Sequence, residues 1–479
     1  MILEQHYLGC LSQASYFIGD EKSATAAVVD PRRDVDEYMQ EAAARGMTIR
    51  HIFLTHFHAD FASGHLELHE KTGATIYLGT GAQADYDFTT LEEGDAVVMG
   101  EVEVRALWTP GHTPESTCYL VFDRAKDAER PRAVLTGDTL FIGDVGRPDL
   151  MASQGVTAEE LAGSLYDSLR DRLLTLPDET IVYPGHGAGS ACGKNLSRET
   201  SSTIGVQRAI NYALQPMTRP EFIRIITAGQ PTAPAYFPHD ARFNRERHDS
   251  LHASLARALA PLSLDEVLKL QGSGAVVLDV RGPAEFSAGH LVGSLCVGID
   301  GRFAQWVGTV LPASTDIVLL AEPGREKEAI VRLGRIGFDR VMGFLEGGIE
   351  AIGDRIELRG SFRRYTPGEL ASELESPGAP RVVDIREHGE REGSHIAGSI
   401  HIPLGEFPAR ASELPATGDI VVHCAGGYRS AIAASILRRR GLRNVSDLQG
   451  GIGAWEDAGH PTVTGAPSSG SAGEPMAAG

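Results

Sequence analysis

The chain reads His56-Phe57-His58-Ala59-Asp60 directly after the apolar run His51-Ile52-Phe53-Leu54-Thr55. Two imidazoles and a carboxylate occupy every second position of a segment that leaves a predicted strand, so their side chains can point the same way. Nitrogen and oxygen donors in this arrangement suit a divalent transition metal. The stretch therefore predicts a metal site at the end of a strand.

Three later segments carry matching groups, each after a short β-rich run and each beside a Gly or Pro turn. They are Thr109-Pro110-Gly111-His112, Leu135-Thr136-Gly137-Asp138 and Tyr183-Pro184-Gly185-His186. One such segment would be a weak signal, whereas four in this order are specific. The sequence therefore predicts a site assembled from loops that follow several strands.

The bulk composition is that of a multidomain globular protein. The chain has 479 residues, and a prior of roughly 150 residues per domain predicts about three domains. A hydrophobic content of 42% with 23% charged residues is typical of soluble globular proteins. The net charge of −20 argues against a nucleic-acid backbone or an anionic membrane as the main partner.

The cysteines and the N-terminus bear on location. The five cysteines are scattered, with no C-x-x-C pair, which indicates free thiols in a reducing compartment. The N-terminus lacks a basic region followed by an apolar stretch, and no run reaches the ~20 apolar residues that span a bilayer. We therefore expect a cytoplasmic protein without a signal peptide.

The C-terminal part contains an internal repeat. Asp279-Val280-Arg281 recurs as Asp384-Ile385-Arg386, and His290-Leu291 recurs as His395-Ile396 at the same offset. Two copies of one domain of roughly 100 residues explain this pattern. Within each copy, β-rich runs alternate with helical runs, which is typical of a parallel α/β sheet.

We expect four parts along the chain. Residues 1–252 form the metal-binding part, residues 262–357 the middle copy and residues 365–463 the C-terminal copy. The tail, residues 464–479, is rich in Gly, Ser, Ala and Pro with little to bury, so we expect it to be disordered. The expected strands cover residues 74–78, 102–107, 118–122, 133–135, 181–183, 275–279, 317–320, 381–384 and 420–423, and the expected helices cover 34–45 and 431–440.

The order of the metal-binding groups carries a family resemblance. His-x-His-x-Asp followed by His, Asp and His resembles the metallo-β-lactamase superfamily, which implies an αββα sandwich with its metal at one edge. Dinuclear hydrolases of that superfamily, such as glyoxalase II, have a further His directly after the Asp of the first motif. This chain has Phe61 there, and an apolar ring cannot ligate a second metal.

The mononuclear branch of the superfamily, the persulfide dioxygenases, is a better match. Its single ferrous iron is held by two His and one Asp, which carries over to His56, His112 and Asp138 and implies one Fe²⁺ per chain. Such a triad leaves positions open for dioxygen and a substrate sulfur. The runs 137–150 and 185–194 strengthen the likeness.

The other polar residues of these motifs each have two interpretations. His58, Asp60 and His186 either ligate, including at a second metal, or hydrogen-bond around the ligands. Arg147 either steadies the anionic end of a thiol substrate or forms a plain salt bridge. Cys192 is either a redox-sensitive thiol or a buried inert cysteine.

A second motif, which we name the thiol loop (residues 423–430), reads His423-Cys424-Ala425-Gly426-Gly427-Tyr428-Arg429-Ser430. It lies between an apolar strand and a helical run, so a thiolate there faces backbone N–H groups and a helix N-terminus. Two glycines allow a tight turn, and Arg429 adds a cation for an oxyanion or persulfide. The loop therefore predicts a nucleophilic cysteine of low pKa.

The thiol loop resembles the C-x-x-G-x-R-S/T active loop of rhodaneses, and the likeness spans most of residues 365–462. It implies that Cys424 carries sulfane sulfur as a persulfide and that Arg429 binds the sulfur-oxyanion substrate. The middle copy has Ala321 or Glu322 in the cysteine's place, and Cys296 lies in the wrong element to substitute. We therefore predict an inactive middle copy that packs between, or orients, the other two parts.

Together the three parts resemble bacterial persulfide dioxygenase–sulfurtransferase fusion proteins of sulfide detoxification. The resemblance implies oxidation of a low-molecular-weight thiol persulfide by O2 at iron, giving sulfite and the free thiol. Cys424 would then transfer sulfane sulfur from a second persulfide to sulfite, giving thiosulfate. The expected partners are the persulfide, O2 and sulfite, without nucleic acid or membrane, and relatives in the superfamily often dimerise.

Two other functions fit the same motifs. The first is a zinc thioester hydrolase of glyoxalase II type joined to a sulfurtransferase; His58, Asp60 and His186 favour it and Phe61 weighs against it. The second is a persulfide carrier or sensor with a vestigial metal site, in which Cys424 takes up sulfur without oxygen consumption. Metal content and oxygen uptake separate the three functions.

Overall fold

The computed structural model describes residues 1–150, 155–230 and 233–465, and the chain divides into two compact units. Unit 1 comprises Met1–Leu259, Arg302–Ser314 and Ile330–Arg340, and unit 2 comprises Ala260–Gly301, Thr315–Ala329 and the residues from Val341 onward. The expected disordered tail lies outside the described residues from residue 466 onward. No helix among the described residues is long and apolar enough to cross a bilayer.

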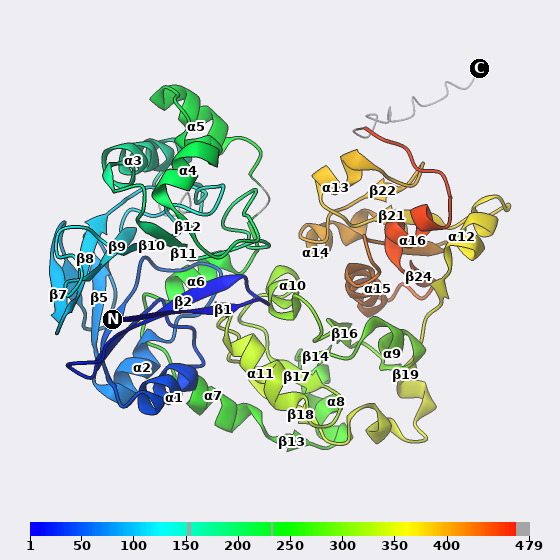
Figure 1. Ribbon diagram of the computed structural model, residues 1–479. Coiled ribbons are helices and arrows are strands. Elements are labelled where there is room, and N and C mark those ends of the chain that lie inside the picture. The colour runs from blue at the N-terminus through cyan, green and yellow to red at the C-terminus, as the bar shows by residue number, and fades with distance from the viewer. Residues whose placement is uncertain (151–154, 231–232, 466–479) are drawn as a thin grey trace. The chain divides into compact units, whose positions relative to one another are not determined.

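Unit 1 is built on two six-stranded sheets (Figure 1). The first has the order β1-β2-β3-β4-β5-β6 and the second the order β12-β11-β10-β9-β8-β7. The strands of the first are β1 (Ile2–Leu8), β2 (Gln13–Asp20), β3 (Thr25–Val29), β4 (Thr48–Phe53), β5 (Thr75–Gly79) and β6 (Thr89–Leu91). Those of the second are β7 (Ala96–Met99), β8 (Val102–Trp108), β9 (Thr117–Asp123), β10 (Ala133–Gly137), β11 (Ile181–Pro184) and β12 (Ser202–Thr203).

Alternation along the strands explains why the two sheets pack face to face. In β2, Tyr16 and Ile18 join a buried cluster with Val121 and Leu135 of the second sheet, whereas Phe17 joins the cluster on the opposite face. That opposite face of the first sheet is covered by α1 (Asp36–Ala44) and α2 (His65–Thr72). The outer face of the second sheet is covered by α3 (Ala158–Asp171) and α5 (Arg219–Thr227). The predicted αββα sandwich is therefore confirmed.

Residues 233–252, at the end of the expected metal-binding part, add structure to unit 1. They contain α6 (Phe237–Phe243) and the start of α7 (Leu251–Ala258), and Tyr236 is buried. These helices are too short to show a helical periodicity in the sequence. The remaining helix of this region is α4 (Ile204–Ile210), and the 3-10 turns are η2 (Leu173–Thr175) and η3 (Tyr212–Leu214).

Unit 2 contains two five-stranded parallel sheets with equivalent strand order, β13-β18-β17-β14-β16 and β20-β24-β23-β21-β22. The first sheet has β13 (Pro261–Leu262), β14 (Val276–Asp279), β16 (Leu295–Cys296), β17 (Ile317–Leu320) and β18 (Val341–Leu345). The second has β20 (Arg364–Tyr365), β21 (Arg381–Asp384), β22 (Ile400–His401), β23 (Ile420–His423) and β24 (Val445–Leu448). A short pair, β15 (His290–Leu291) with β19 (Arg359–Gly360), stands apart. Both parallel α/β domains are therefore confirmed.

Helices alternate with the strands of both copies. The helices are α8 (Leu264–Gly272), α9 (Pro283–Ala288), α10 (Phe303–Val310), α11 (Glu326–Gly334), α12 (Pro367–Leu374), α13 (His388–Gly393), α14 (Phe407–Arg410), α15 (Arg429–Arg439) and α16 (Gly451–Asp457). The 3-10 turns are η4 (Gly348–Ile352), η5 (Ile356–Leu358) and η6 (Ala411–Glu413). Helix α10 and the end of α11 lie in the middle copy by sequence. In the structure they pack with unit 1 and belong to it.

The repeat extends to individual side-chain pairs. Asp279 and Arg281 form a two-pronged buried ion pair at 2.9 and 2.5 Å, and Asp384 and Arg386 form its counterpart at 3.0 and 2.8 Å. Both pairs brace the loop after the first long strand of their copy, as expected for a structural role. The repeated motif therefore records a shared fold rather than shared chemistry.

Candidate metal centre and thiol loop

Strand ends bring the metal-binding motifs together. His56 follows β4, His112 follows β8, Asp138 follows β10 and His186 follows β11. Strands β10 and β11 are parallel neighbours, so the loops that carry Asp138 and His186 leave the same edge of the sheet. Gly137, with φ +49°, makes this approach possible, because a Cβ there would lie 2.5 Å from Oγ1 of Thr55, beside His56.

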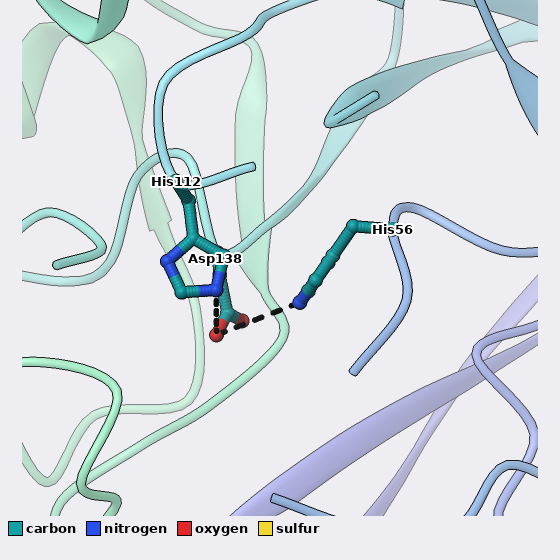
Figure 2. A group of neighbouring side chains, drawn as sticks. All are labelled: His56, His112 and Asp138. Atoms are coloured by element: carbon teal, nitrogen blue, oxygen red, sulfur yellow. Dashed lines mark ion pairs between the residues drawn. The ribbon is translucent and has the colours of Figure 1, made fainter. Parts of the chain in front are cut away.

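Three of the predicted ligands converge on one point (Figure 2). One possible ligand atom of each of the three residues, His56, His112 and Asp138, lies within 4.8 Å of the other two, and all three residues are buried. Oδ2 of Asp138 lies 3.9 Å from Nε2 of His56 and 3.6 Å from Nε2 of His112. That carboxylate oxygen is buried and has no hydrogen-bond partner among the described residues. An orphaned anion facing two imidazole nitrogens fits a divalent metal.

Hydrogen bonds set the tautomer of both imidazoles. Nδ1 of His112 donates to the backbone carbonyl of Arg147 at 2.8 Å. The Thr55 hydroxyl donates to Asp30 at 2.8 Å, so it accepts from Nδ1 of His56 at 3.0 Å. In both rings Nε2 is thereby left as the nitrogen with a lone pair, turned toward Asp138. The two histidines are thus prepared to ligate through Nε2.

The charges around the centre agree with metal binding. Burial holds the pKa of His56 well below its ordinary value, and the neighbouring His58 lowers it further. Burial alone would raise the pKa of Asp138, but His186, His56 and His112 lower it, so the carboxylate is ionised. Neutral imidazoles and an ionised carboxylate are the forms that bind a cation.

His58, Asp60 and His186, which the sequence left open as ligands or hydrogen-bonding neighbours, surround the three candidate ligands. Nδ1 of His186 donates to Oδ1 of Asp138 at 2.8 Å, and its Nε2 lies 2.8 Å from Asp60. The two carboxylates raise the pKa of His186 well above its ordinary value although burial lowers it. Nε2 of His58 lies 3.0 Å from Asp30. Of the three residues, His186 hydrogen-bonds a candidate ligand directly, whereas His58 and Asp60 lie beside charged neighbours.

A second group of possible donors lies next to the first. Atoms of Asp60, His186 and Cys192 also lie within 4.8 Å of one another, and all are buried. Phe61 is 1% exposed and its ring centroid lies 4.3 Å from that of His58, so an apolar ring packs beside His58. Burial raises the pKa of the Cys192 thiol well above its ordinary value, which is the behaviour of an inert buried cysteine.

Arg147 forms a salt bridge near the candidate metal centre. Its guanidinium is buried, forms a two-pronged ion pair with Asp149 at 2.7 Å and donates to the carbonyl of Ala191 at 3.2 Å. Its backbone carbonyl is the acceptor that orients His112. The residue therefore contributes to the site through the position of its main chain.

Asp30, which was not predicted as a site residue, organises the segment that carries His56 and His58. Its carboxylate accepts from the backbone N–H and the hydroxyl of Thr55 and lies beside His58. The only local signal was an Asp-Pro turn after the apolar run 26–29, with Asp30 at φ +49°. Tyr236 and Asn244 were also missed: Asn244 donates to the carbonyls of His58 and Phe61, and Tyr236 to that of Asp60.

In unit 2 the thiol loop presents Cys424 at the end of β23. The side chain is buried, and Sγ accepts the backbone N–H of Gly427 at 3.1 Å. Sγ lies 3.8 Å from the hydroxyl of Ser430, which donates to Asp447 at 3.0 Å. An amide that points at sulfur and a helix, α15, that begins at Arg429 are features that favour a thiolate or a persulfide anion.

Two arginines flank the thiol loop, and both have carboxylate partners. Arg429 pairs with Glu390 at 2.6 and 2.8 Å. Arg364 pairs with Asp447 at 2.8 and 2.9 Å and donates to the carbonyl of Gly427 at 3.2 Å. The sequence analysis missed Arg364 because it lies in a two-residue strand without a local pattern. Arg364 hydrogen-bonds the main chain of the thiol loop at Gly427. Arg429 is the first residue of helix α15.

The position equivalent to Cys424 in the middle copy is Ala321. Asp279 pairs with Leu320 in the middle sheet, as Asp384 pairs with His423 in the C-terminal one. The next residue is Ala321 in the first case and Cys424 in the second. Of the two sequence alternatives, Ala321 is therefore the counterpart and Glu322 is not, and a methyl group cannot hold a sulfane sulfur.

The residue before the thiol makes a pH-dependent contribution to stability. His423 is fully buried, and burial lowers its pKa to about 4. The unfolded chain therefore binds a proton at this residue between about pH 6.5 and 4 that the folded chain rejects, so stability falls as pH falls through this window. We expect His423→Gln to remove up to about 3 kcal/mol of that decrease. Urea unfolding followed at Trp455 at pH 7 and 4.5 measures it, and identical pH dependence in both proteins would refute the assignment.

The chain matches two known families. The family described as metallo-beta-lactamase superfamily matches residues 8–186, and the family described as rhodanese-like domain matches residues 263–354 and 366–458. The chain belongs to the metallo-β-lactamase superfamily and carries two rhodanese-like domains after its metallo-β-lactamase domain.

The similar proteins include two enzymes with different names. The chain is 30% identical over 253 residues to the hydroxyacylglutathione hydrolase of Rhodospirillum rubrum, covering 50% of this chain and 85% of that protein. It is 28% identical over 216 residues to "Persulfide dioxygenase ETHE1, mitochondrial" of Bos taurus, covering 44% of this chain and 75% of that protein. A metallo-β-lactamase structure from Staphylococcus aureus subsp. aureus COL aligns with a TM-score of 0.64 and 30% identity, covering 72% of this chain and 98% of that one.

Proposed function

We propose that the protein oxidises low-molecular-weight thiol persulfides with O2 at one ferrous iron and converts the sulfite formed into thiosulfate at Cys424. The observation that carries the first step is the convergence of two buried imidazoles and one ionised carboxylate, from His56, His112 and Asp138. Two His and one carboxylate on one face are the donor set of non-haem iron oxygenases. Similarity to a bovine protein named persulfide dioxygenase supports the substrate class.

The proposed reaction balances for a four-electron oxidation. A persulfide, O2 and water give the free thiol, sulfite and two protons; the outer sulfur loses four electrons and O2 accepts them. His56, His112 and Asp138 would hold the iron, which would supply the redox-active centre for this oxidation. The chain's own residues orient the ligands: Thr55 and the carbonyl of Arg147 hold the two rings, and His186 holds Asp138.

The second step uses the thiol loop. Cys424 attacks the outer sulfur of a second persulfide, the S–S bond breaks, and the free thiol leaves with a proton while Cys424 holds the sulfur. Sulfite then attacks that outer sulfur, releasing thiosulfate and the Cys424 thiolate. The backbone N–H of Gly427 and the start of α15 stabilise negative charge on sulfur in both directions. Arg429 is the cation proposed to attract sulfite.

Tethering the two steps has a physical advantage. Sulfite is a reactive product, and a chain that carries both sites raises its effective concentration near the acceptor. The small-molecule partners are thus the thiol persulfide, O2 and sulfite.

A zinc-dependent thioester hydrolase is the second candidate. It is favoured by the similarity to the Rhodospirillum rubrum hydroxyacylglutathione hydrolase and by the second donor group of Asp60, His186 and Cys192. The third candidate function is that of a persulfide carrier or sensor with a vestigial metal site.

Metal counting separates the dioxygenase from the hydrolase. We expect the protein purified without added metal under anaerobic conditions to bind one Fe²⁺ per chain, because Phe61 and the pairing of Asp60 with His186 occupy the second position. Elemental analysis after dialysis gives the number directly. Two zinc ions per chain with thioesterase activity would favour the hydrolase instead.

A further inference from the structure

The middle copy lacks a nucleophile, yet two of its segments belong to the metal-binding unit. Residues Arg302–Ser314, which contain α10, and Ile330–Arg340, which contain the end of α11, are part of unit 1. Both touch the surroundings of the first metal loop, which we define as residues 56–64. The contacts are polar and specific, and a passive linker would not need them.

The segment at and just after the end of α11 is held within unit 1 by two partly buried ion pairs. Arg33, 1% exposed, binds Asp339 at 2.5 and 2.6 Å and donates to the carbonyl of Gly334 at 2.9 Å. Arg335 binds Asp34 at 3.0 and 2.6 Å. Between these clamps the carbonyl of Arg335 accepts the backbone N–H of Ala62 at 2.7 Å. The middle copy thus satisfies a main-chain donor of the first metal loop itself.

Helix α10 acts on the same loop through Tyr236. The Tyr236 ring lies on Gly308 so closely that a Cβ there would be 2.7 Å from Cγ of the ring. In this position the buried Tyr236 hydroxyl donates to the carbonyl of Asp60 at 3.2 Å. Only glycine leaves room for the ring, so the sequence of α10 determines where that hydroxyl lies.

These contacts connect to the candidate ligands through a chain of neighbouring residues. The hydrogen bonds to the N–H of Ala62 and to the carbonyl of Asp60 hold the first metal loop in place. The carboxylate of Asp60 lies 2.8 Å from His186, and His186 donates a hydrogen bond to Asp138. The remaining oxygen of Asp138 is the one that faces His56 and His112. Groups behind the ligands change metal affinity by about 10–100-fold when they are lost.

We propose that the cysteine-less middle copy is a structural component of the metal centre, with Gly308 and Tyr236 as positioning residues for the first metal loop. This rests on the proposed function only in that a metal binds His56, His112 and Asp138. It requires neither iron nor oxygen chemistry. The middle copy would then be retained for the geometry it imposes on the first domain rather than for sulfur transfer.

The test uses the full chain loaded with Co²⁺, whose visible spectrum reports ligand geometry. We expect Gly308→Ala to release Co²⁺ to a chelator ~10-fold faster and Tyr236→Phe ~3–10-fold faster, with changed spectra. Alanine is the better helix former by about 1 kcal/mol, so Gly308→Ala does not weaken α10 itself. The matched control is Gly368→Ala in α12, where a Cβ meets nothing within 4 Å, and it should match the unmodified chain.

Tyr236→Phe keeps the proposal falsifiable if Gly308→Ala does not fold, because it removes one hydroxyl and no packing. Sulfur uptake at Cys424 checks that unit 2 is intact in each variant. Release rates and spectra equal to those of the unmodified chain in Tyr236→Phe would overturn the proposal, even if melting temperatures fell. A normal metal site that shows no persulfide oxidation would instead count against the proposed function alone.

Discussion

His112→Ala should abolish metal binding and oxygen uptake together and leave sulfur transfer intact. Removing one of three buried donors leaves Asp138 and His56 with an incomplete set, and we expect metal affinity to fall by at least ~100-fold. Oxygen consumption with a thiol persulfide should fall to that of the metal-free protein. Sulfur loading of Cys424 should be unchanged, because its loop is built wholly within unit 2.

The matched control for this variant is His69→Ala. His69 is part-buried and its Nδ1 bonds the carbonyl of Ala74, away from the candidate ligands. Its removal should leave metal content and oxygen uptake within about twofold, since the lost hydrogen bond is worth only about 1 kcal/mol of stability. Loss of both activities in His112→Ala would refute the division of labour between the two sites.

Cys424→Ser should have the opposite effect. A hydroxyl cannot hold a sulfane sulfur, so we expect sulfur transfer to fall by more than ~10³-fold. Oxygen uptake should continue, and sulfite rather than thiosulfate should accumulate. Ion chromatography of the sulfur oxyanions measures the change.

Cys10→Ser controls for the loss of a thiol as such. Cys10 lies in unit 1, partly buried and outside both candidate sites. It should give the thiosulfate yield of the unmodified chain. Unchanged thiosulfate output from Cys424→Ser would remove that cysteine from the mechanism.

The elements that the sequence predicted best were those with a local pattern. Apolar runs followed by turn residues identified β8, β9, β11, β17, β21 and β23 to within a residue or two, and the repeated Asp-x-Arg motif identified the two copies. The first three strands were not predicted. They form a meander whose middle strand, β2, is buried along its whole length, so it lacks the polar alternation that marks a half-exposed strand.

The candidate metal ligands could be predicted from the sequence, but the residues that position them could not. His56, His112 and Asp138 could be named because each stands beside a Gly or Pro turn in a motif. Asp30 and Tyr236 could not, because they reach the site from other parts of the chain through tertiary contacts: Asp30 contacts Thr55 and His58, and Tyr236 contacts the carbonyl of Asp60. The same holds for the middle copy: its missing cysteine is visible in the sequence, whereas its contacts with the first metal loop depend on tertiary packing.

The first experiment to make is the measurement of oxygen consumption by the iron-loaded full chain on addition of a thiol persulfide. We expect rapid uptake with one O2 consumed per sulfite-equivalent of sulfur oxyanion formed, and no uptake by the metal-free protein. Absence of uptake with several thiol persulfides, in a protein shown to hold one iron at full occupancy, would contradict it and favour the hydrolase or the carrier.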